Sequence, residues 1–520
     1  MILSPPLNNG LMSTSQQTVS KYDSEFCGSL PIHLINVIQP YAALLVVDQS
    51  SLRIIQASEN VDAVFQRPVT SVVNTGLDKW ITPAAVDALR ERFSGQAKDK
   101  IPVSWEIAGH KRLALVHVKT PYYMVEIHLE SEPGAEQLSF VDVYQDLKPV
   151  MTAIDAAQTT AGVAGTVARE LKKLSGFDKV MVYRFDAEWN GHVLAEAMEP
   201  GMESYLGFTF PASDIPRQAR DLYLKNAYRF IPDREYRPVN LYPVINPSTN
   251  GFIDLSDCNS RGVSAVHLEY LKNMHVSASM STRIIRDDRL WGLIACHHRT
   301  ARRMDYKLCA VFELLSGIIS AKILSLENKE KHDFDMLLQG IYTGLVEETY
   351  RTADLQESLL GEGANILQLF RAGGAAIMYK GHTSRLGNTP ARQHLDDLLL
   401  WLHTLQLKKI FYTDRLSQRY DYAADYRDVA SGLLVIPINS RRDEYILLFR
   451  PEVPRVINWG GNPEERIFFE KDMTTYHPRF SFTLWQEKVS GVSLPWNDEE
   501  LAKAESLRSF VYEYTTSHHF

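Results

Sequence analysis

The first patterned stretch of the chain, from Pro31 to about Leu129, alternates apolar and polar positions in the manner of strands. The runs YAALLVVD and LRIIQAS predict two strands of a hairpin, and SWEIAGHKRLALVHVKTPYYMVEIHLE predicts further strands broken by a Gly-His turn and a proline. Helical spacing is found around residues 60–65 and 83–93. The following SEPGAEQ, rich in Glu, Gly and Pro, is typical of a linker. This stretch therefore predicts a small α+β domain.

A second patterned stretch begins with helical spacing from Val141 to Leu174, which Gly176 is expected to end. The strand VMVYRFD follows, and the apolar runs SASMSTRII and LWGLIACHH predict neighbouring strands around an Arg-Asp-Asp turn. Between them, residues 231–260 hold many turn residues and little periodicity. A loop of that length inside a domain is usually functional.

The third stretch begins with apolar residues at helical spacing from Met304 to about Glu347, which predicts one long helix or two joined helices. GGAAIMYK, KKIFYTD, SGLLVIPIN and EYILLFRPE predict strands, residues 453–482 are irregular, and residues 498–514 are helical again. The fold class is therefore α+β, with three consecutive sensor-type modules joined by long helices. That architecture is compatible with cyclic-nucleotide, haem or light sensing, so the residues must decide.

Composition and charge exclude several function classes. The chain has 520 residues, 45% of them hydrophobic, and a net charge of −8, with no basic stripe of the kind that binds nucleic acid. We find no run of about 18 apolar residues and no secretory signal, which predicts a cytoplasmic protein without a spanning helix. The four cysteines show no CxxC pair, so neither a disulfide framework nor a zinc site is indicated. The sequence also has no dinucleotide or P-loop glycine motif, and we expect no enzyme activity in this chain.

Several short segments, in order along the chain, resemble the signature segments of phytochromes. They are PASDIPRQAR (Pro211–Arg220), YLKNM (Tyr270–Met274), LWGLIACHH (Leu290–His298), FRPE with NWGG (Phe449–Glu452, Asn458–Gly461) and HPRFSF (His477–Phe482). The resemblance implies a flexible arm over residues 1–24, a PAS domain over 25–135, a GAF domain over 136–322 and a PHY domain over 323–520. It further implies that residues of about 453–483 form a PHY tongue, and that the loop 231–260 is a lasso through which the arm threads to make a knot.

The residue before His267 distinguishes the chromophore classes of this family. Plant and cyanobacterial phytochromes carry their attachment cysteine directly before that histidine, whereas this chain has Val266. Cys27 instead stands four residues ahead of Pro31-Ile32-His33, as in the attachment segment of bacteriophytochromes. The resemblance therefore implies biliverdin IXα, a linear tetrapyrrole, bonded to Cys27. An idle thiol near the terminus is the alternative.

By the same resemblance, Asp214 accepts from pyrrole N–H groups through its main-chain oxygen and links to the tongue through its carboxylate. An Asp in this context is also a common helix N-cap. His267 lies beside the chromophore and exchanges protons near neutral pH, unless it is an ordinary core histidine. His297 lies near the D-ring carbonyl. Arg479 of the tongue pairs with Asp214 in one photostate and re-pairs in the other.

The remaining pocket residues are assigned by resemblance. Arg229 and Arg261 match the arginines that hold the propionates, since a guanidinium can bind a carboxylate through two hydrogen bonds. Ser279 and Ser281 share one face of a strand, as bonding to the second propionate requires, although two such serines also fit a solvent-facing pattern. The residues expected to line the pocket around the D-ring and pyrroles are Tyr183, Phe210, Ile215, Pro216, Tyr223 and Tyr270.

The resemblance also implies a homodimer and a signalling output beyond this chain. A histidine kinase that acts on a response regulator is the commonest output, and a cyclic-di-GMP output comes next. No phosphoacceptor block or ATP-binding glycine box follows the third module within the 520 residues. The alternative function is a ligand or tetrapyrrole sensor with the same fold and no photochemistry.

Overall fold

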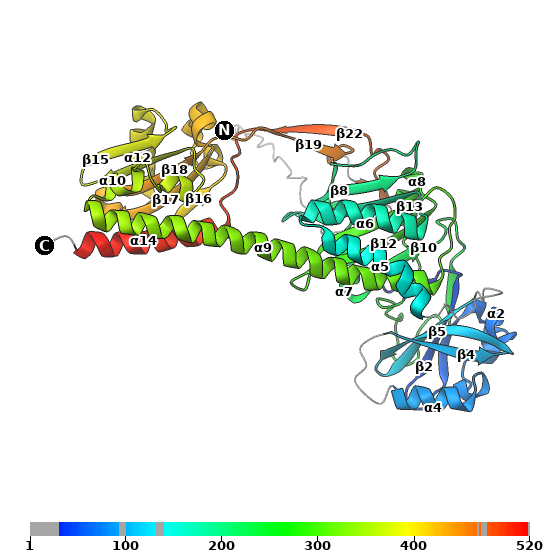
Figure 1. The fold of residues 1–520 in the computed structure, drawn as a ribbon. Helices are drawn as coiled ribbons and strands as arrows, with labels where there is room; N and C mark the ends of the chain where they lie inside the picture. Colours follow the sequence, from blue (N-terminus) through cyan, green and yellow to red (C-terminus); the bar gives the residue numbers. More distant parts are fainter. Residues whose placement is uncertain (1–30, 93–99, 130–139, 465–466, 470–475, 518–520) are drawn as a thin grey trace, which may run out of the picture. The chain divides into compact units, whose positions relative to one another are not determined.

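The computed structural model describes residues 31–92, 100–129, 140–464, 467–469 and 476–517. The chain forms two compact units, Met1–Ile323 with Trp459–Trp485, and Leu324–Asn458 with Gln486–Phe520. Figure 1 gives the labels of the helices and strands. Cys27 lies outside the described residues, as does the arm predicted over 1–24.

The first domain is a sheet with the strand order β1-β11-β3-β2-β6-β5-β4. The apolar runs that predicted strands form its centre, where β2 pairs with both β3 and β6. Positive φ at Ala108 and Gly109 turns β4 back into β5, at the predicted Gly-His turn. The elements are β1 (Val37–Ile38), β2 (Ala42–Asp48), β3 (Ile54–Ser58), α2 (Asp62–Phe65), α3 (Val69–Val72), α4 (Pro83–Arg92), β4 (Ile101–Ile107), β5 (His110–Lys119), β6 (Tyr122–His128) and β11 (Val239–Tyr242).

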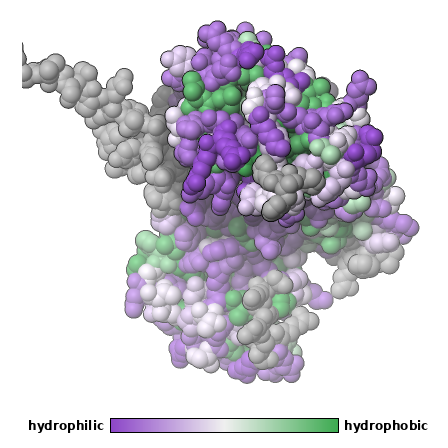
Figure 2. Space-filling view, turned by 90° about the vertical axis from the view of Figure 1, so that its left-hand side faces the viewer, coloured by the Kyte–Doolittle hydropathy of each residue, from purple (hydrophilic) through white to green (hydrophobic). Residues whose placement is uncertain are grey.

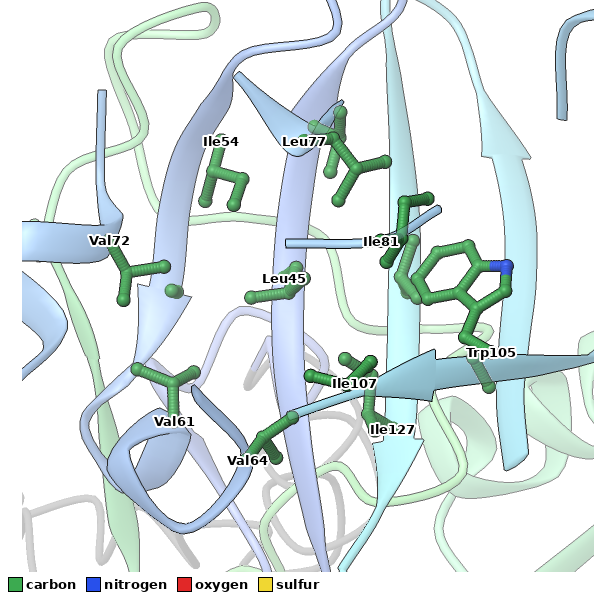
Figure 3. Packing of buried hydrophobic residues seen from close by; sticks show 14 of the residues in the cluster. Leu45, Ile54, Val61, Val64, Val72, Leu77, Ile81, Trp105, Ile107 and Ile127 are labelled. Atoms are coloured by element: carbon green, nitrogen blue, oxygen red, sulfur yellow. The ribbon is translucent and has the colours of Figure 1, made fainter. Parts of the chain in front are cut away.

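An apolar core fills the space between one face of this sheet and the short helices. Leu45 and Ile127 point into it from the sheet, Val64 from α2 and Trp105 from β4, as Figure 3 shows. All four side chains are buried. Burial of alternate strand residues on this face is the main stabilising contribution to the domain.

The opposite face of the sheet is covered by a chain segment from far along the sequence. The long loop predicted over 231–260 contributes β11 to the sheet, and its residues Leu255 and Cys258 pack against Leu44 and Met124. The prediction of an irregular loop was therefore incomplete. The strand forms because the first domain offers it two backbone partners, β1 and β3.

The N-terminal segment 33–39 lies between two arms of that loop. On one side β1 pairs with β11. On the other side Gln39 donates its N–H to the carbonyl of Ser260 at 2.7 Å, and Gly262 donates to the carbonyl of Val37 at 2.8 Å. The described part of the N-terminal segment thus lies within the long loop, as the predicted threading of the arm through that loop requires.

The second domain has the strand order β10-β12-β13-β7-β8-β9, which β19 and β22 continue. Asp287 and Asp288 both have positive φ and make the predicted turn between β12 and β13, a conformation that Asp tolerates better than most residues. The elements are α5 (Phe140–Ala156), α6 (Thr160–Ser175), β7 (Lys179–Phe185), β8 (Gly191–Met198), β9 (Thr209–Phe210), α7 (Arg217–Lys225), β10 (Tyr228–Ile231), α8 (Ala265–Asn273), β12 (Ala278–Arg286), β13 (Arg289–His298), β19 (Arg455–Gly460) and β22 (Leu484–Val489).

The helical pattern predicted over 141–174 forms two helices, α5 and α6. The side chain of Thr159 accepts from the N–H of Gly162 at 3.0 Å, so this residue caps a new helix instead of continuing the first. Gly176 adopts a left-handed conformation and ends α6, as predicted.

One helix, α9 (Tyr306–Thr352), spans 47 residues without interruption and confirms the single-helix alternative. By length and composition it could cross a membrane, contrary to the expectation from the sequence, and 33% of its most apolar window is buried. Its buried residues Phe312, Ile319 and Ile323 recur at helical spacing, and the Ser320 hydroxyl accepts from the N–H of Ile285 in β12 at 2.9 Å. These contacts are those of a helix packed on a sheet.

The third domain is a sheet with the order β15-β14-β18-β17-β16, with helices on both faces. The later part of α9, α10, α11 and α14 pack on one face, and α12 and α13 on the other. The elements are α10 (Leu355–Leu360), α11 (Ile366–Leu369), β14 (Gly374–Tyr379), β15 (His382–Gly387), α12 (Arg392–Leu405), β16 (Phe411–Thr413), α13 (Arg427–Ala430), β17 (Gly432–Asn439), β18 (Glu444–Arg450) and α14 (Asp498–Ser517).

Hydrophilic residues predominate on the face drawn in Figure 2, with hydrophobic ones interspersed.

The stretch predicted as irregular, 453–482, contains ordered strands. Besides β19, it holds β20 (Ile467–Phe469), which pairs antiparallel with β21 (Tyr476–Pro478). The sequence pattern missed β20 and β21, because a strand of three residues is too short to show alternation.

We predict that Leu448→Ala destabilises the third domain by about 3 kcal/mol. Leu448 lies in β18 and is fully buried, so truncation removes apolar contacts and leaves a cavity. Urea unfolding of the chain, followed by circular dichroism, measures the change. Leu400→Ala on α12 is the matched control, because that side chain is 69% exposed and should change stability little. Equal effects of the two substitutions would contradict the assignment of the core.

Candidate functional site

A cavity of about 250 Å³ lies on the face of the second sheet that carries α7 and α8. Apolar and aromatic side chains form most of its wall, and a few charged groups point into it. The structure brings nearly all the residues predicted from the sequence together here. Those that line the cavity are Tyr183, Phe210, Asp214, Ile215, Pro216, Tyr223, Arg229, Arg261, His267, Tyr270, Ser279, Ser281, His297 and Arg479.

Asp214 and Arg479 form an ion pair at the cavity wall, and both side chains are buried. The same Asp214 oxygen accepts from the hydroxyl of Tyr270 at 2.9 Å. The helix-cap alternative for Asp214 is wrong, because α7 starts at Arg217 with Pro216 at its N-cap and no side-chain cap. Burial would lower the pKa of Arg479, but the charge of Asp214 raises it, so the guanidinium is charged.

The segment that carries Arg479 contacts α8 at two further points. Asn273 donates its side-chain N–H to the carbonyl of Arg479 at 3.1 Å. His477 Nδ1 lies 2.9 Å from a carboxylate oxygen of Glu269. These residues were not predicted from the sequence, although the four-residue spacing of Glu269 and Asn273 places both on one helix face.

Both predicted histidines face the cavity. Burial, followed by the charge of Arg229, lowers the pKa of His267 to about 4. Burial, followed by the charge of Lys179, lowers that of His297 to about 3. The rings of His267 and Tyr270 are stacked, with an interplanar angle of 7°. Both imidazoles are therefore neutral at pH 7 and can accept as well as donate hydrogen bonds.

The two predicted arginines differ in how they are bonded. Arg229 donates from Nη2 to the carbonyls of Arg261 at 2.6 Å and Gly262 at 2.8 Å, so it holds the long loop. Arg261 is 7% exposed, and within the described part of the chain its buried Nη1 has no hydrogen-bond partner. Burial, and then repulsion by Arg229, lower the pKa of Arg261 to about 9, which leaves it charged at neutral pH. Arg261 is thus the better anchor for an anionic group.

The serines and the aromatic residues are placed as predicted. Ser279 and Ser281 of β12 both line the cavity, so the solvent-facing alternative for this pair is wrong. The hydroxyl of Tyr223 lies 2.6 Å from that of Ser281. Tyr183 and Phe210 form a tilted ring pair with centroids 6.1 Å apart. Together they supply an apolar wall with a few hydroxyl groups.

Lys179 is a buried cation near the site that was not predicted from the sequence. It is the register partner of His297, and its ammonium group lies 3.7 Å from the ring centre of Tyr205 and 3.9 Å from a carboxylate oxygen of Glu196. Burial lowers its pKa to about 8, against the charge of Glu196. Lys179 stands two residues before Met181, which lines the cavity, so the two side chains lie on the same face of the strand. This spacing could have indicated that Lys179 lies near the cavity.

Models of three known domains match this chain. The model of the phytochrome region matches residues 338–519, that of the PAS fold residues 27–130, and that of the GAF domain residues 161–323. Cyanobacterial phytochrome B of Nostoc sp. is 35% identical over 495 residues, which cover 94% of this chain and 66% of the relative. The bacteriophytochrome of Xanthomonas campestris pv. campestris is 32% identical over 502 residues, which cover 94% of this chain and 78% of the relative.

Solved structures show the same likeness. A bacteriophytochrome from the photosynthetic bacterium R. palustris superposes with a TM-score of 0.82 at 32% identity, covering 95% of this chain and 100% of that chain. The Stigmatella aurantiaca phytochrome photosensory core module gives 0.79 at 33% identity, covering 95% and 99%. The chain spans 66%, 64% and 65% of the lengths of three cyanobacterial relatives.

We predict that His297 makes the apoprotein less stable in acid. Its pKa is near 3 in the folded protein, against an ordinary value of 6.5, so the unfolded chain takes up the proton first as the pH falls. The folded state then loses about 2 kcal/mol at pH 5 from this residue. Calorimetric unfolding should show that His297→Gln loses less stability than the wild type between pH 7 and pH 5.

The control for this prediction is His110→Gln, at an exposed position of the β4–β5 turn. It should respond to pH as the wild type does. If His297→Gln also responds as the wild type does, the buried neutral histidine is not the cause of the acid sensitivity.

Proposed function

Because the chain belongs to the phytochrome family of photoreceptors, which carry a linear tetrapyrrole, we propose that it is a red/far-red photoreceptor with biliverdin IXα bound covalently at Cys27. Its proposed role is to convert absorption of light into a change in the tongue and thereby to switch a C-terminal signalling output. The observation that carries this proposal is the cavity itself. The cavity has mostly apolar walls and is lined by Arg261, whose buried Nη1 has no partner among the described residues, and by the ion pair of Asp214 with Arg479 of the tongue.

The cavity fits biliverdin chemically. A largely apolar tetrapyrrole with two propionates needs apolar walls, cationic or hydroxyl anchors for its carboxylates, and polar groups for its nitrogens. Arg261 has a buried N–H donor that no residue of the described part of the chain occupies, and Ser279 and Ser281 offer hydroxyl groups. His267 and the main chain of Asp214 are the proposed partners of the pyrrole nitrogens, with Ile215 and Pro216 beside them.

Three observations support Cys27 as the attachment residue. The residue before His267 is Val266, which lines the cavity and has no thiol. The cysteines in the described part of the chain, Cys258, Cys296 and Cys309, are buried, their pKa values are raised by burial, and none lines the cavity. Ile32 does line it, and the five Cα–Cα steps from Cys27 to Ile32 span up to about 18 Å. The segment from Cys27 to Ile32 is therefore long enough to bring the Cys27 thiol to the pocket.

Biliverdin, when bound, supplies absorption of red light and isomerisation about the C15=C16 double bond of its D-ring. The residues proposed to surround that ring are Tyr183, Phe210, Tyr270 and His297, all of which line the cavity. A neutral His297 would donate a hydrogen bond to the ring carbonyl. The Asp214–Arg479 pair holds the tongue at its junction with the cavity, because breaking the pair leaves a buried charge uncompensated.

We place the signalling output in a domain outside the 520 residues. The matched regions cover 66% and 78% of the lengths of two relatives, so those proteins are longer than the part that matches this chain. We propose a histidine kinase that signals to a response regulator, with control of a cyclic-di-GMP output as the second candidate. The proposal further includes a homodimer in the cytoplasm, no enzyme activity in the 520 residues, and no contact with nucleic acid or membrane.

We predict that purified apoprotein binds added biliverdin and then converts reversibly between red- and far-red-absorbing forms. Absorbance spectra before and after red and far-red light measure the conversion, and denaturing electrophoresis measures the covalent adduct. Cys27→Ser should lose the adduct. The matched control is Cys309→Ser, which should keep it, since Cys309 is buried away from the cavity. An adduct without photoconversion would favour the non-photochromic tetrapyrrole sensor.

We predict that Arg479→Ala binds biliverdin but changes the yield or the lifetime of the photoproduct. Removing the guanidinium leaves Asp214 buried without its cation and opens the junction to water. Flash photolysis and dark-recovery kinetics measure the effect. Arg455→Ala, at an exposed position of β19, is the control. Unchanged yield and lifetime in Arg479→Ala would rule out the proposed role of the pair.

A further inference from the structure

We propose that Glu126, on a strand of the first domain, is a positioning residue for Arg261 and thereby helps the second domain bind the anionic groups of its chromophore. The inference rests on the proposed function, because it makes the propionates the ligands of Arg261. It assigns the first domain a direct part in shaping the pocket.

Glu126 is a carboxylate inside the first domain. It lies in β6 with 1% exposure and shares a strand face with Tyr122 and Met124, which the long loop covers. Burial alone would raise its pKa, but the hydrogen bond and charge of His117, whose Nε2 lies 2.8 Å from Oε1, help hold the pKa well below its ordinary value. Glu126 is therefore ionised, with both oxygens available as acceptors.

The partners of this carboxylate are main-chain groups of the long loop. Oε1 accepts from the N–H of Asn259 at 3.0 Å, and Oε2 accepts from the N–H of Ser260 at 2.6 Å. The Ser260 hydroxyl, at 2.6 Å, and the Cys258 thiol, at 3.2 Å, also donate to Oε2. Glu126 thus fixes the residues that directly precede Arg261.

A cation of the second domain holds the same loop segment through its carbonyls. Arg229 of β10 donates to the carbonyls of Asn259 at 3.2 Å, Arg261 at 2.6 Å and Gly262 at 2.8 Å. The peptide group that joins Asn259 and Ser260 therefore has its N–H towards the carboxylate of Glu126 and its C=O towards the guanidinium of Arg229. Opposite charges at the two ends of this peptide dipole stabilise one backbone position.

Fixing the main chain determines where the Arg261 side chain starts. That side chain reaches the cavity with a buried Nη1 for which the described residues provide no partner. A donor held in place before the ligand arrives loses little entropy on binding, so its contribution to affinity is largest when the backbone is fixed. Without the carboxylate, the N–H groups of Asn259 and Ser260 lose their buried acceptor, and the segment is expected to shift.

The test compares Glu126→Gln with wild type in binding two tetrapyrroles, biliverdin and biliverdin dimethyl ester, whose propionates carry no charge. Glutamine keeps the size of the side chain but replaces one acceptor oxygen with an N–H₂ donor. Absorbance of the bound tetrapyrrole gives the dissociation constant before covalent attachment, measured in the Cys27→Ser background. We expect biliverdin binding to weaken by about tenfold or more and ester binding to stay within about twofold of wild type.

Two further variants sharpen the comparison. Glu106→Gln, at an exposed position of β4 in the same sheet, should change neither affinity. In an Arg261→Gln background, Glu126→Gln should cause no further loss for biliverdin, because the two residues act through one contact.

An equal loss for biliverdin and its dimethyl ester would overturn the inference, because a residue that only supports the fold affects both ligands alike. Additive losses for Glu126→Gln and Arg261→Gln would also overturn it. If Glu126→Gln does not fold, Ser260→Ala removes one donor to Oε2 and is judged by the same two-ligand criterion. Failure of wild type to bind either tetrapyrrole would instead overturn the proposed function, and the inference with it.

Discussion

A guanidinium that is 2% exposed determines how the cavity of the second domain is closed. Arg479 can keep its charge there because Asp214 neutralises it and the carbonyl of Gly460 accepts one of its N–H groups. The rings of Phe210 and Phe482 lie 5.3 Å and 4.7 Å from the guanidinium and exclude water. A partly docked tongue would leave a buried charge without its partner, which is costly. A partly docked segment is therefore less stable than a fully docked one.

The short helix α8 connects this closure to the interior of the cavity. His267 and Tyr270 line the cavity, and Tyr270 bonds to Asp214, while Glu269 and Asn273 bond to the tongue segment. A rotation or shift of α8 therefore changes both sets of contacts at once. Coupling of this kind needs only one rigid element with partners on two sides, and no long chain of intermediate residues.

The sequence predicted those helices and strands whose patterns are local. It failed where contact with a segment far along the chain determines which residues are buried. A short apolar run located β2, period-two alternation located β6, and Gly176 marked a helix end. The same alternation would place Glu126 on a solvent face, because nothing near it in sequence shows that residues more than a hundred positions later cover that face. The pocket residues were predicted from the resemblance to phytochromes, and those among the described residues line one cavity, as expected. The domain boundaries and Cys27 stay predictions.

The charges around the cavity explain which kind of ligand it selects. Asp214 is neutralised by Arg479, Lys179 lies near Glu196, and Arg229 is satisfied by loop carbonyls. His267 and His297 carry no charge at neutral pH, since their pKa values are low. Arg261 remains as a charged group with a buried donor that the described residues leave unpaired. A buried cation in that state is stabilised by any anion that enters, so a ligand with a carboxylate gains affinity that a neutral one of the same shape does not.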